Sequence, residues 1–124
     1  MEIHFFDDPQ QGRLPREEVR FNQLGLYVYE DGRRVAVGFD ITPFQERPSI
    51  DVAVRNEAGD IVGTLTVIEA LQPNFHLTLH LRDEGAAENY ELEAQLYYLE
   101  AEERRRLVVD RLSRTFDATQ PGDQ

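Results

Sequence analysis

Apolar residues occupy every second position over long stretches of the chain. The pattern is clear in residues 35–41, 50–54, 75–81 and 90–98, where a larger apolar or aromatic residue alternates with a residue that is most often small or polar. Successive side chains of a β-strand point to opposite faces, so this period predicts strands with one buried and one exposed face. Gly, Pro, Asn and Asp gather between the runs, which indicates tight turns.

The first long strand, residues 19–29, contains a change of phase. Its apolar residues are odd-numbered up to Phe21 and even-numbered from Leu24 onward. One extra residue in a strand produces this shift, because it moves all later side chains to the other face. We therefore expect a β-bulge near Asn22 and Gln23.

Residues 91–116 allow two interpretations. Glu, Ala, Leu and Arg are good helix formers, and several leucines in the segment have helical spacing. The apolar stripe of such a helix is broken at Glu103 and Asp110, whereas the alternation from Tyr90 to Tyr98 is continuous. We favour a strand hairpin, because packing usually overrides propensity, and keep the helix as the alternative.

The pattern divides the chain into three parts. Residues 1–18 are expected to form a short edge strand, at Ile3 to Phe6, followed by a linker rich in Pro, Gly and charge. Residues 19–116 form the sandwich domain, and 124 residues suffice for one such core. The polar residues 117–124 are expected to be a disordered tail.

Short strands with one apolar face and no intervening helices are satisfied by an antiparallel β-sandwich, here of about seven or eight strands. The order of the strands and the run Tyr90-x-Leu92-x-Ala94-x-Leu96 resemble bacterial immunoglobulin-like domains and their strand with the corner tyrosine. The chain departs from antibody-type domains because it has no Cys and no Trp. The resemblance implies an immunoglobulin-like all-β fold for residues 19–116.

The charge balance argues against two classes of partner. The chain has 24 acidic and 13 basic residues, a formal net charge of -11, which repels nucleic-acid phosphates and anionic lipids. We therefore expect neither nucleic acid nor membrane as a partner. Without Cys there is no disulfide and no thiolate site. The first residues do not form a secretory signal, so a cytoplasmic location is expected.

Acidic loops are expected to meet at one end of the sandwich. If every connection reverses the chain, the loops near residues 30–31, 56–60 and 83–89 share that end. Their acidic residues are Asp31, Glu57, Asp60, Asp83, Glu84 and Glu88. Oxygen-rich loops can bind calcium, but turns also favour these residues for backbone reasons, and no Asp-x-Asp-x-Asp run is present. We favour the turn explanation and keep a calcium site as the alternative.

No catalytic motif is present. His76 and His80 are four residues apart, which on a strand separates them by about 13 Å, too far to share one zinc ion. Ser49 and Ser113 lack a Gly-x-Ser-x-Gly setting, and there is no glycine-rich phosphate loop. The sequence therefore predicts a protein that is not an enzyme and needs no cofactor.

Two groups of residues are candidates for binding a partner. Tyr27, Tyr29 and Tyr97 face away from the leucines of their strands, so exposed rings are expected, and they form one surface if both strands share a sheet. Arg104 and Arg105 belong to a mixed-charge hairpin tip. We favour a charge-balanced, solvated tip and keep docking of a protein partner by complementary charge as the alternative. We interpret the chain as a non-catalytic interaction module that binds a protein partner or itself. The alternative is a β-sandwich that binds carbohydrate or calcium.

Overall fold

The computed structural model describes residues 12–83, 88–100 and 105–124. In these residues the chain forms eight strands and a short 3-10 helix, η2. The elements are η2 Arg16–Glu18, β1 Phe21–Val28, β2 Arg34–Ile41, β3 Ser49–Arg55, β4 Ile61–Val67, β5 Asn74–His80, β6 Asn89–Glu100, β7 Arg105–Asp117 and β8 Gly122–Asp123. The described chain contains no α-helix, so the all-β prediction is confirmed.

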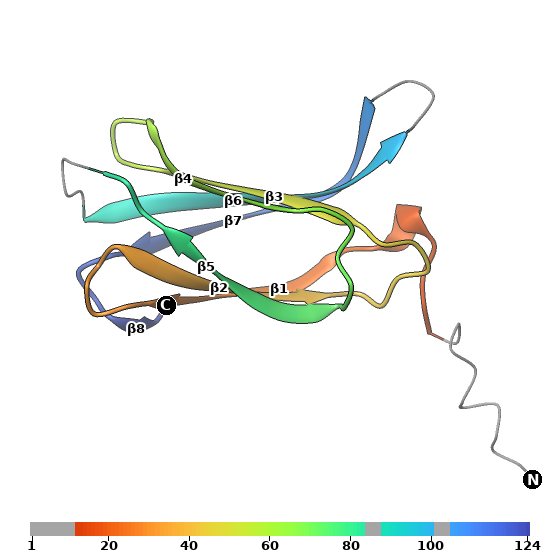
Figure 1. Ribbon diagram of the computed structural model, residues 1–124, viewed down its shortest axis with the longest axis horizontal. Coiled ribbons are helices and arrows are strands. Elements are labelled where there is room, and N and C mark those ends of the chain that lie inside the picture. Colours follow the sequence, from red (N-terminus) through yellow and green to blue (C-terminus); the bar gives the residue numbers. More distant parts are fainter. Residues whose placement is uncertain (1–11, 84–87, 101–104) are drawn as a thin grey trace, which may run out of the picture.

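The strands form two four-stranded sheets that lie face to face (Figure 1). Sheet I has the order β5-β2-β1-β8 and sheet II the order β4-β3-β6-β7. Every pairing between strands is antiparallel. Strands β6 and β7 pair along almost their whole length, so the hairpin interpretation of residues 91–116 is confirmed and the helix is wrong.

The core lies between the sheets and contains the residues that the alternation predicts. Each strand contributes its apolar face, with members such as Val35, Val37, Ile50, Leu92 and Leu96 fully buried. Leu77 is the exception, because it lies on the edge strand β5 and remains 37% exposed. The apolar faces of the two sheets are therefore buried against each other in most of the sandwich, but beside β5 part of the apolar layer remains exposed.

The expected irregularity in β1 is present. The register of β1 against β2 shifts between Phe21 and Gln23, and Leu24 and Leu26 beyond it point into the core. Two further shifts, between Leu96 and Tyr97 of the β6 and β7 pair and between Val54 and Arg55 of the β3 and β4 pair, were not expected from the sequence. A bulge of this kind allows residues on either side of it to keep an apolar face toward the core.

The C-terminal segment, expected to be disordered, has a defined structure. Ala118 is buried and donates its backbone N–H to the carbonyl of Glu88 at 2.8 Å. Strand β8 then pairs with the end of β1, and Gln124 N–H donates to the Leu26 carbonyl at 3.0 Å. The segment is ordered because the outer edge of β1 offers backbone groups that need partners. The predicted edge strand at residues 3–6 lies outside the described residues.

Candidate functional site

The three tyrosines predicted to share a surface are separated. Tyr27 is 46% exposed on the outer face of sheet I and meets the ring of Tyr29 edge to face, with centroids 5.7 Å apart. Tyr97 belongs to sheet II and is only 2% exposed. The guanidinium of Arg106 lies 4.1 Å from the centroid of the Tyr97 ring and covers it. The prediction of one surface with three exposed rings is therefore wrong.

The arginine candidates do not join the tyrosines. Arg105 begins β7 and lies 3.7 Å from Glu100 in an exposed ion pair. This hairpin tip is at the end of the sandwich opposite the turn between β1 and β2, where Tyr29 lies (Figure 1). Arg104 lies outside the described residues. The candidate residues thus occupy opposite ends of the molecule.

The acidic loops do lie at one end of the sandwich, as expected (Figure 1). Asp31 accepts hydrogen bonds from the Arg33 backbone at 2.9 Å and the Arg34 side chain at 2.8 Å, which together lower the pKa of its carboxyl. Glu57 accepts from Asn89 at 3.3 Å. Asp31 therefore stabilises its own loop, as turn residues do, whereas Glu57 joins the loop after β3 to the start of β6.

The same end offers no evident metal site. Asp83 accepts a hydrogen bond from the hydroxyl of Tyr90 at 3.1 Å. The other predicted calcium ligands at this end are Asp60, Glu88 and Glu84, of which Glu84 lies outside the described residues. Among the residues that the structure describes, no three His, Asp or Glu side chains gather closely enough to hold a metal ion. The calcium hypothesis gains no support from this part of the chain.

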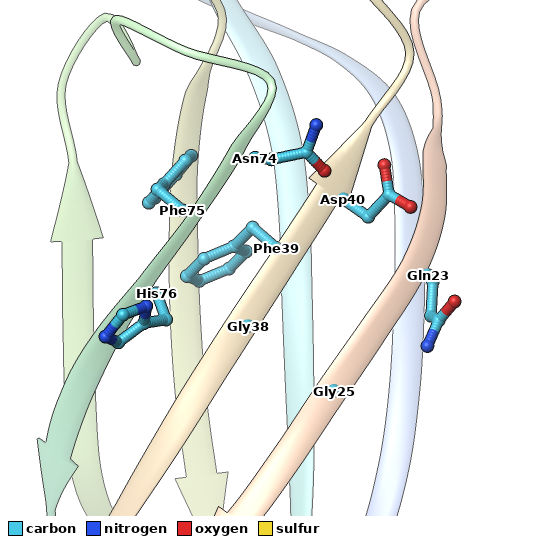
Figure 2. Close-up of a pocket in the computed structure, with 8 residues that line it drawn as sticks. All are labelled: Gln23, Gly25, Gly38, Phe39, Asp40, Asn74, Phe75 and His76. Atoms are coloured by element: carbon cyan, nitrogen blue, oxygen red, sulfur yellow. The ribbon is translucent and has the colours of Figure 1, made fainter.

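A shallow hollow lies on the outer face of sheet I (Figure 2). Its floor is the backbone of Gly25 and Gly38, which are directly opposite each other on β1 and β2. Figure 2 shows His76 on one side of these glycines, with Gln23 and Asp40 on the other. The hollow has a volume of about 450 Å³, which is enough for a small ligand.

The polar side chains around this hollow are free to bind. The side chains of Gln23, Asn74 and His76 form no hydrogen bond or ion pair with another described residue, and each residue is exposed. Among the described residues, the Asp40 side chain accepts only a long hydrogen bond, 3.5 Å, from Asn22 on the neighbouring strand β1. The rim therefore presents two amides, an imidazole and a carboxylate to solvent.

The second candidate surface is the side of the sandwich where β4 and β5 form the outer strands of the two sheets. The two strands touch where Arg82 N–H donates to the Val62 carbonyl at 2.7 Å. Toward the connecting loop they enclose an open apolar space of about 320 Å³. We call this space the apolar wedge, and its apolar lining consists of Val67, Ile68, Ala70, Leu71, Phe75 and Leu77.

The opposite side of the sandwich is closed by side chains. On the outer edge of β1, Phe21 N–H donates to Asp110 at 2.9 Å, and Arg114 donates to the Leu24 carbonyl. Both partners belong to β7 of the other sheet. Backbone groups that would invite another strand are thus occupied at β1, whereas strands β4 and β5 have no comparable cover of charged side chains.

Sequence reasoning missed both surfaces. The absence of Asp, Glu, Lys and Arg from β4 and β5 is visible in the sequence, but only the sheet order shows that both strands are outer strands on the same side. Likewise, Gly25 and Gly38 are ordinary glycines until strand pairing places them opposite each other. The missing information in both cases is which strands are neighbours.

Comparison with known proteins identifies the fold. No protein-family model matches the chain, and no curated protein matches it. It is similar in structure to part of a glycosyl hydrolase family 2 member from Bacteroides cellulosilyticus, with TM-score 0.52 and 11% identity over 81% of this chain and 15% of that chain. It also overlaps part of the β-glucuronidase of Ruminococcus gnavus, with TM-score 0.44 and 13% identity over 79% of this chain and 15% of that chain.

The likeness to the first of these enzymes concerns the fold alone. The chain spans about 15% of the length of both enzymes. The architecture and the neighbour confirm the resemblance to immunoglobulin-like β-sandwich domains. In the part of the chain that the structure describes, no helix has the length and apolar character needed to cross a membrane.

Proposed function

We propose that this protein is a non-catalytic interaction module that associates with a second copy of itself through strand β5 and the apolar wedge. The observation that carries the proposal is the pair of outer strands β4 and β5, which lie on one side of the sandwich and contain no charged residue. Outer strands of soluble proteins usually carry charges, prolines or bulges that block pairing. An unblocked edge favours the addition of another strand.

The apolar wedge supports association at this side. Ile68 is 61% exposed and Leu71 is 74% exposed, and both lie next to the half-exposed Leu77. Apolar side chains that gather on a surface, rather than lie scattered over it, indicate a contact with another molecule. A partner strand beside β5 would bury these side chains and continue the apolar layer of the sandwich.

The charge of the protein favours this side for a contact between identical copies. Two chains that each carry a net charge of -11 repel one another. The repulsion is weaker at strands β4 and β5, which contain no charged residue, although Glu69 also lines the apolar wedge. Leu77 is the middle residue of β5. If β5 of one copy pairs antiparallel with β5 of the other and the two Leu77 residues lie opposite each other, the two strands overlap along their whole length. Such a self-complementary contact generates a closed dimer with two-fold symmetry.

The non-catalytic part of the proposal is supported by the state of the candidate nucleophile. Ser49 is buried, and its hydroxyl accepts a hydrogen bond from the Glu69 backbone at 3.0 Å. It therefore anchors the loop that follows β4. His76 and His80 lie on β5 of the other sheet, so neither is placed as its general base.

Oligomeric state tests the proposal directly. We expect wild-type protein to form a dimer in size-exclusion chromatography with light scattering, and Leu77→Lys to be monomeric because a charge is placed where the two copies meet. Leu71→Lys should also weaken the dimer. The Leu71 side chain is largely exposed, so this substitution should not lower the stability of the fold.

Leu99→Lys is the matched control. Leu99 is 59% exposed on β6 of the other sheet, away from the apolar wedge, so the same substitution there should leave the dimer intact. Circular dichroism confirms that each variant keeps its strands. A wild-type protein that stays monomeric at all accessible concentrations, or a dimer that neither Leu77→Lys nor Leu71→Lys weakens, would refute the proposal.

A further inference from the structure

Two glycines face each other in the middle of sheet I without a structural need for glycine. Gly25 and Gly38 form a regular pair of β1 and β2, and neither has the positive φ that glycine alone adopts easily. Glycine inside a strand costs about 0.5–1 kcal/mol relative to Ala and provides no side chain to pack. A pair of them in the two central strands of the sheet therefore lowers stability with no evident gain in the fold.

Packing does not require these glycines either. A Cβ atom built on Gly25 would meet nothing within 4 Å, and one on Gly38 would meet only the Gly25 carbonyl oxygen at 3.9 Å. Gly63 shows the contrast, since its Cβ would lie 2.7 Å from the Leu79 side chain and 2.9 Å from the His80 carbonyl oxygen. Gly63 is thus required by the contact between the sheets, whereas Gly25 and Gly38 leave open space on the outside.

Strand glycines with open space above them are found where another molecule approaches the backbone closely. We propose that the hollow over Gly25 and Gly38 is a binding site for one ring of a neutral carbohydrate. The flat ring lies on the bare backbone, and its hydroxyl groups exchange hydrogen bonds with Gln23, Asp40 and His76. Phe75 of β5 lines both this hollow and the apolar wedge, but the carbohydrate proposal rests on the glycine pair and does not depend on self-association.

The chemistry of the rim selects this ligand class. Amide, carboxylate and imidazole groups together supply the donors and acceptors that neighbouring hydroxyls need, and all of these side chains lie around one hollow (Figure 2). The residues that line the hollow include no Arg or Lys. With Asp40 at the rim and a net charge of -11 on the chain, an anionic ligand is repelled.

Tyr27 extends the surface along β1. It lies two residues beyond Gly25 on the same face, and its ring is 46% exposed. Aromatic rings offer a flat apolar surface with a polar tip, which suits the next sugar ring of a chain. The site is therefore open at the Tyr27 side and takes an internal segment of an oligosaccharide as readily as its end.

The test is a titration of ¹⁵N-labelled protein with neutral oligosaccharides, namely those of cellulose, xylan, mannan and starch, and with oligogalacturonate as the anionic comparison. We expect saturable shifts of the Gly25 and Gly38 amide signals with at least one neutral oligosaccharide and none with oligogalacturonate. The inference is overturned if no neutral oligosaccharide shifts these signals, or if oligogalacturonate shifts them as strongly.

Variants distinguish a binding role from a structural one. Gly38→Val fills the hollow and should weaken binding at least tenfold while the melting temperature stays equal or rises, because Val has a higher strand propensity. Asp40→Ala should also weaken binding without unfolding the protein. Ala53→Val introduces the same residue on the outer face of β3 in the other sheet, so this variant should bind like wild type.

Two outcomes would count against the role of the glycines. Unchanged binding in Gly38→Val would show that the hollow is not the site, and a melting temperature lowered as much as in Gly63→Ala would show that packing needs the glycine. The dimer proposed above should persist in Gly38→Val, because this residue lies on the outer face of the sheet and not in the apolar wedge. Failure of one proposal therefore leaves the other intact.

Discussion

Two buried tyrosine hydroxyls hold loops against the sandwich through single hydrogen bonds. Tyr90 donates to the carboxylate of Asp83 at 3.1 Å, and Tyr98 donates to the backbone carbonyl of Glu46 at 2.9 Å. Burial raises the pKa of each hydroxyl to about 12, and the nearby carboxylates of Asp83 and Glu46 add to this. Each of these hydrogen bonds therefore requires a protonated phenol.

This pKa shift predicts a loss of stability in alkali. The pKa of each phenol is higher in the folded chain than the ordinary value of 10.0, so its contribution is fully present below about pH 10 and is lost as the pH rises through about 12. Tyr98→Phe removes the hydrogen bond and should cost about 1 kcal/mol of unfolding free energy at pH 7.

The difference in unfolding free energy between wild type and Tyr98→Phe should disappear at high pH. There the Tyr98 hydroxyl of the wild type ionises and loses its hydrogen bond, whereas Phe does not ionise. Urea unfolding at a series of pH values, followed by circular dichroism, measures the difference between wild type and Tyr98→Phe. A difference that stays constant from pH 7 to about 12 would contradict the role of the raised pKa.

At the scale of elements, the outer edge of β1 depends on side chains of the opposite sheet. Arg114 of β7 donates both to the carbonyl of Leu24 and, at 3.0 Å, to that of Gln124. One guanidinium thus joins β1, β7 and the C-terminal segment. This contact explains why β8 is ordered and why the sandwich is closed on that side.

Loss of this contact should be costly. Arg114→Ala leaves the Leu24 carbonyl without its partner, and we expect a loss of about 1–3 kcal/mol in unfolding free energy, as is usual for hydrogen bonds to charged groups. Hydrogen exchange should become faster at the Gln124 amide, which donates to Leu26, and along β8. Denaturant unfolding and hydrogen exchange measure the two effects.

Arg111→Ala is the control for this prediction. Arg111 lies on the same strand and is exposed, and its side chain has no partner among the described residues, so the substitution should change stability by less than about 0.5 kcal/mol. Equal losses in the two variants would mean that the stability effect reflects net charge and not the contact with Leu24.

For the whole molecule, charge and strand edges act against each other. The net charge of -11 opposes contact between copies, while strands β4 and β5, which contain no charged residue, permit it. Salt shortens the range of the repulsion to about 10 Å at 0.1 M. The proposed dimer should therefore bind more tightly as the salt concentration rises.

Sedimentation equilibrium in a series of sodium chloride concentrations up to about 0.5 M measures this effect. We expect the dimer dissociation constant to fall as the salt concentration increases, in contrast to contacts formed by opposite charges, which weaken. A dissociation constant that rises with salt would indicate pairing through charged groups, such as those near Arg105, rather than through β5.

Alternation in the sequence was sufficient for much of the fold. It placed the strands, the bulge between Phe21 and Gln23, the hairpin of β6 and β7, and the shared end of the acidic loops. These features follow from local rules, because the period of a strand and the reversal at a turn depend only on nearby residues. The same rules identified most of the core, in which Leu24 and Leu96 are examples.

Only the tertiary structure decided which strands are neighbours and what covers each face. Tyr97 lies in the other sheet and is covered by Arg106, and residues 117–124 are ordered against β1. Leu77 is partly exposed on the outer strand β5. The tertiary structure also placed Gly25 opposite Gly38. Pairing between distant strands depends on the packing of the whole chain, so a pattern of nearby residues carries too little information to predict it.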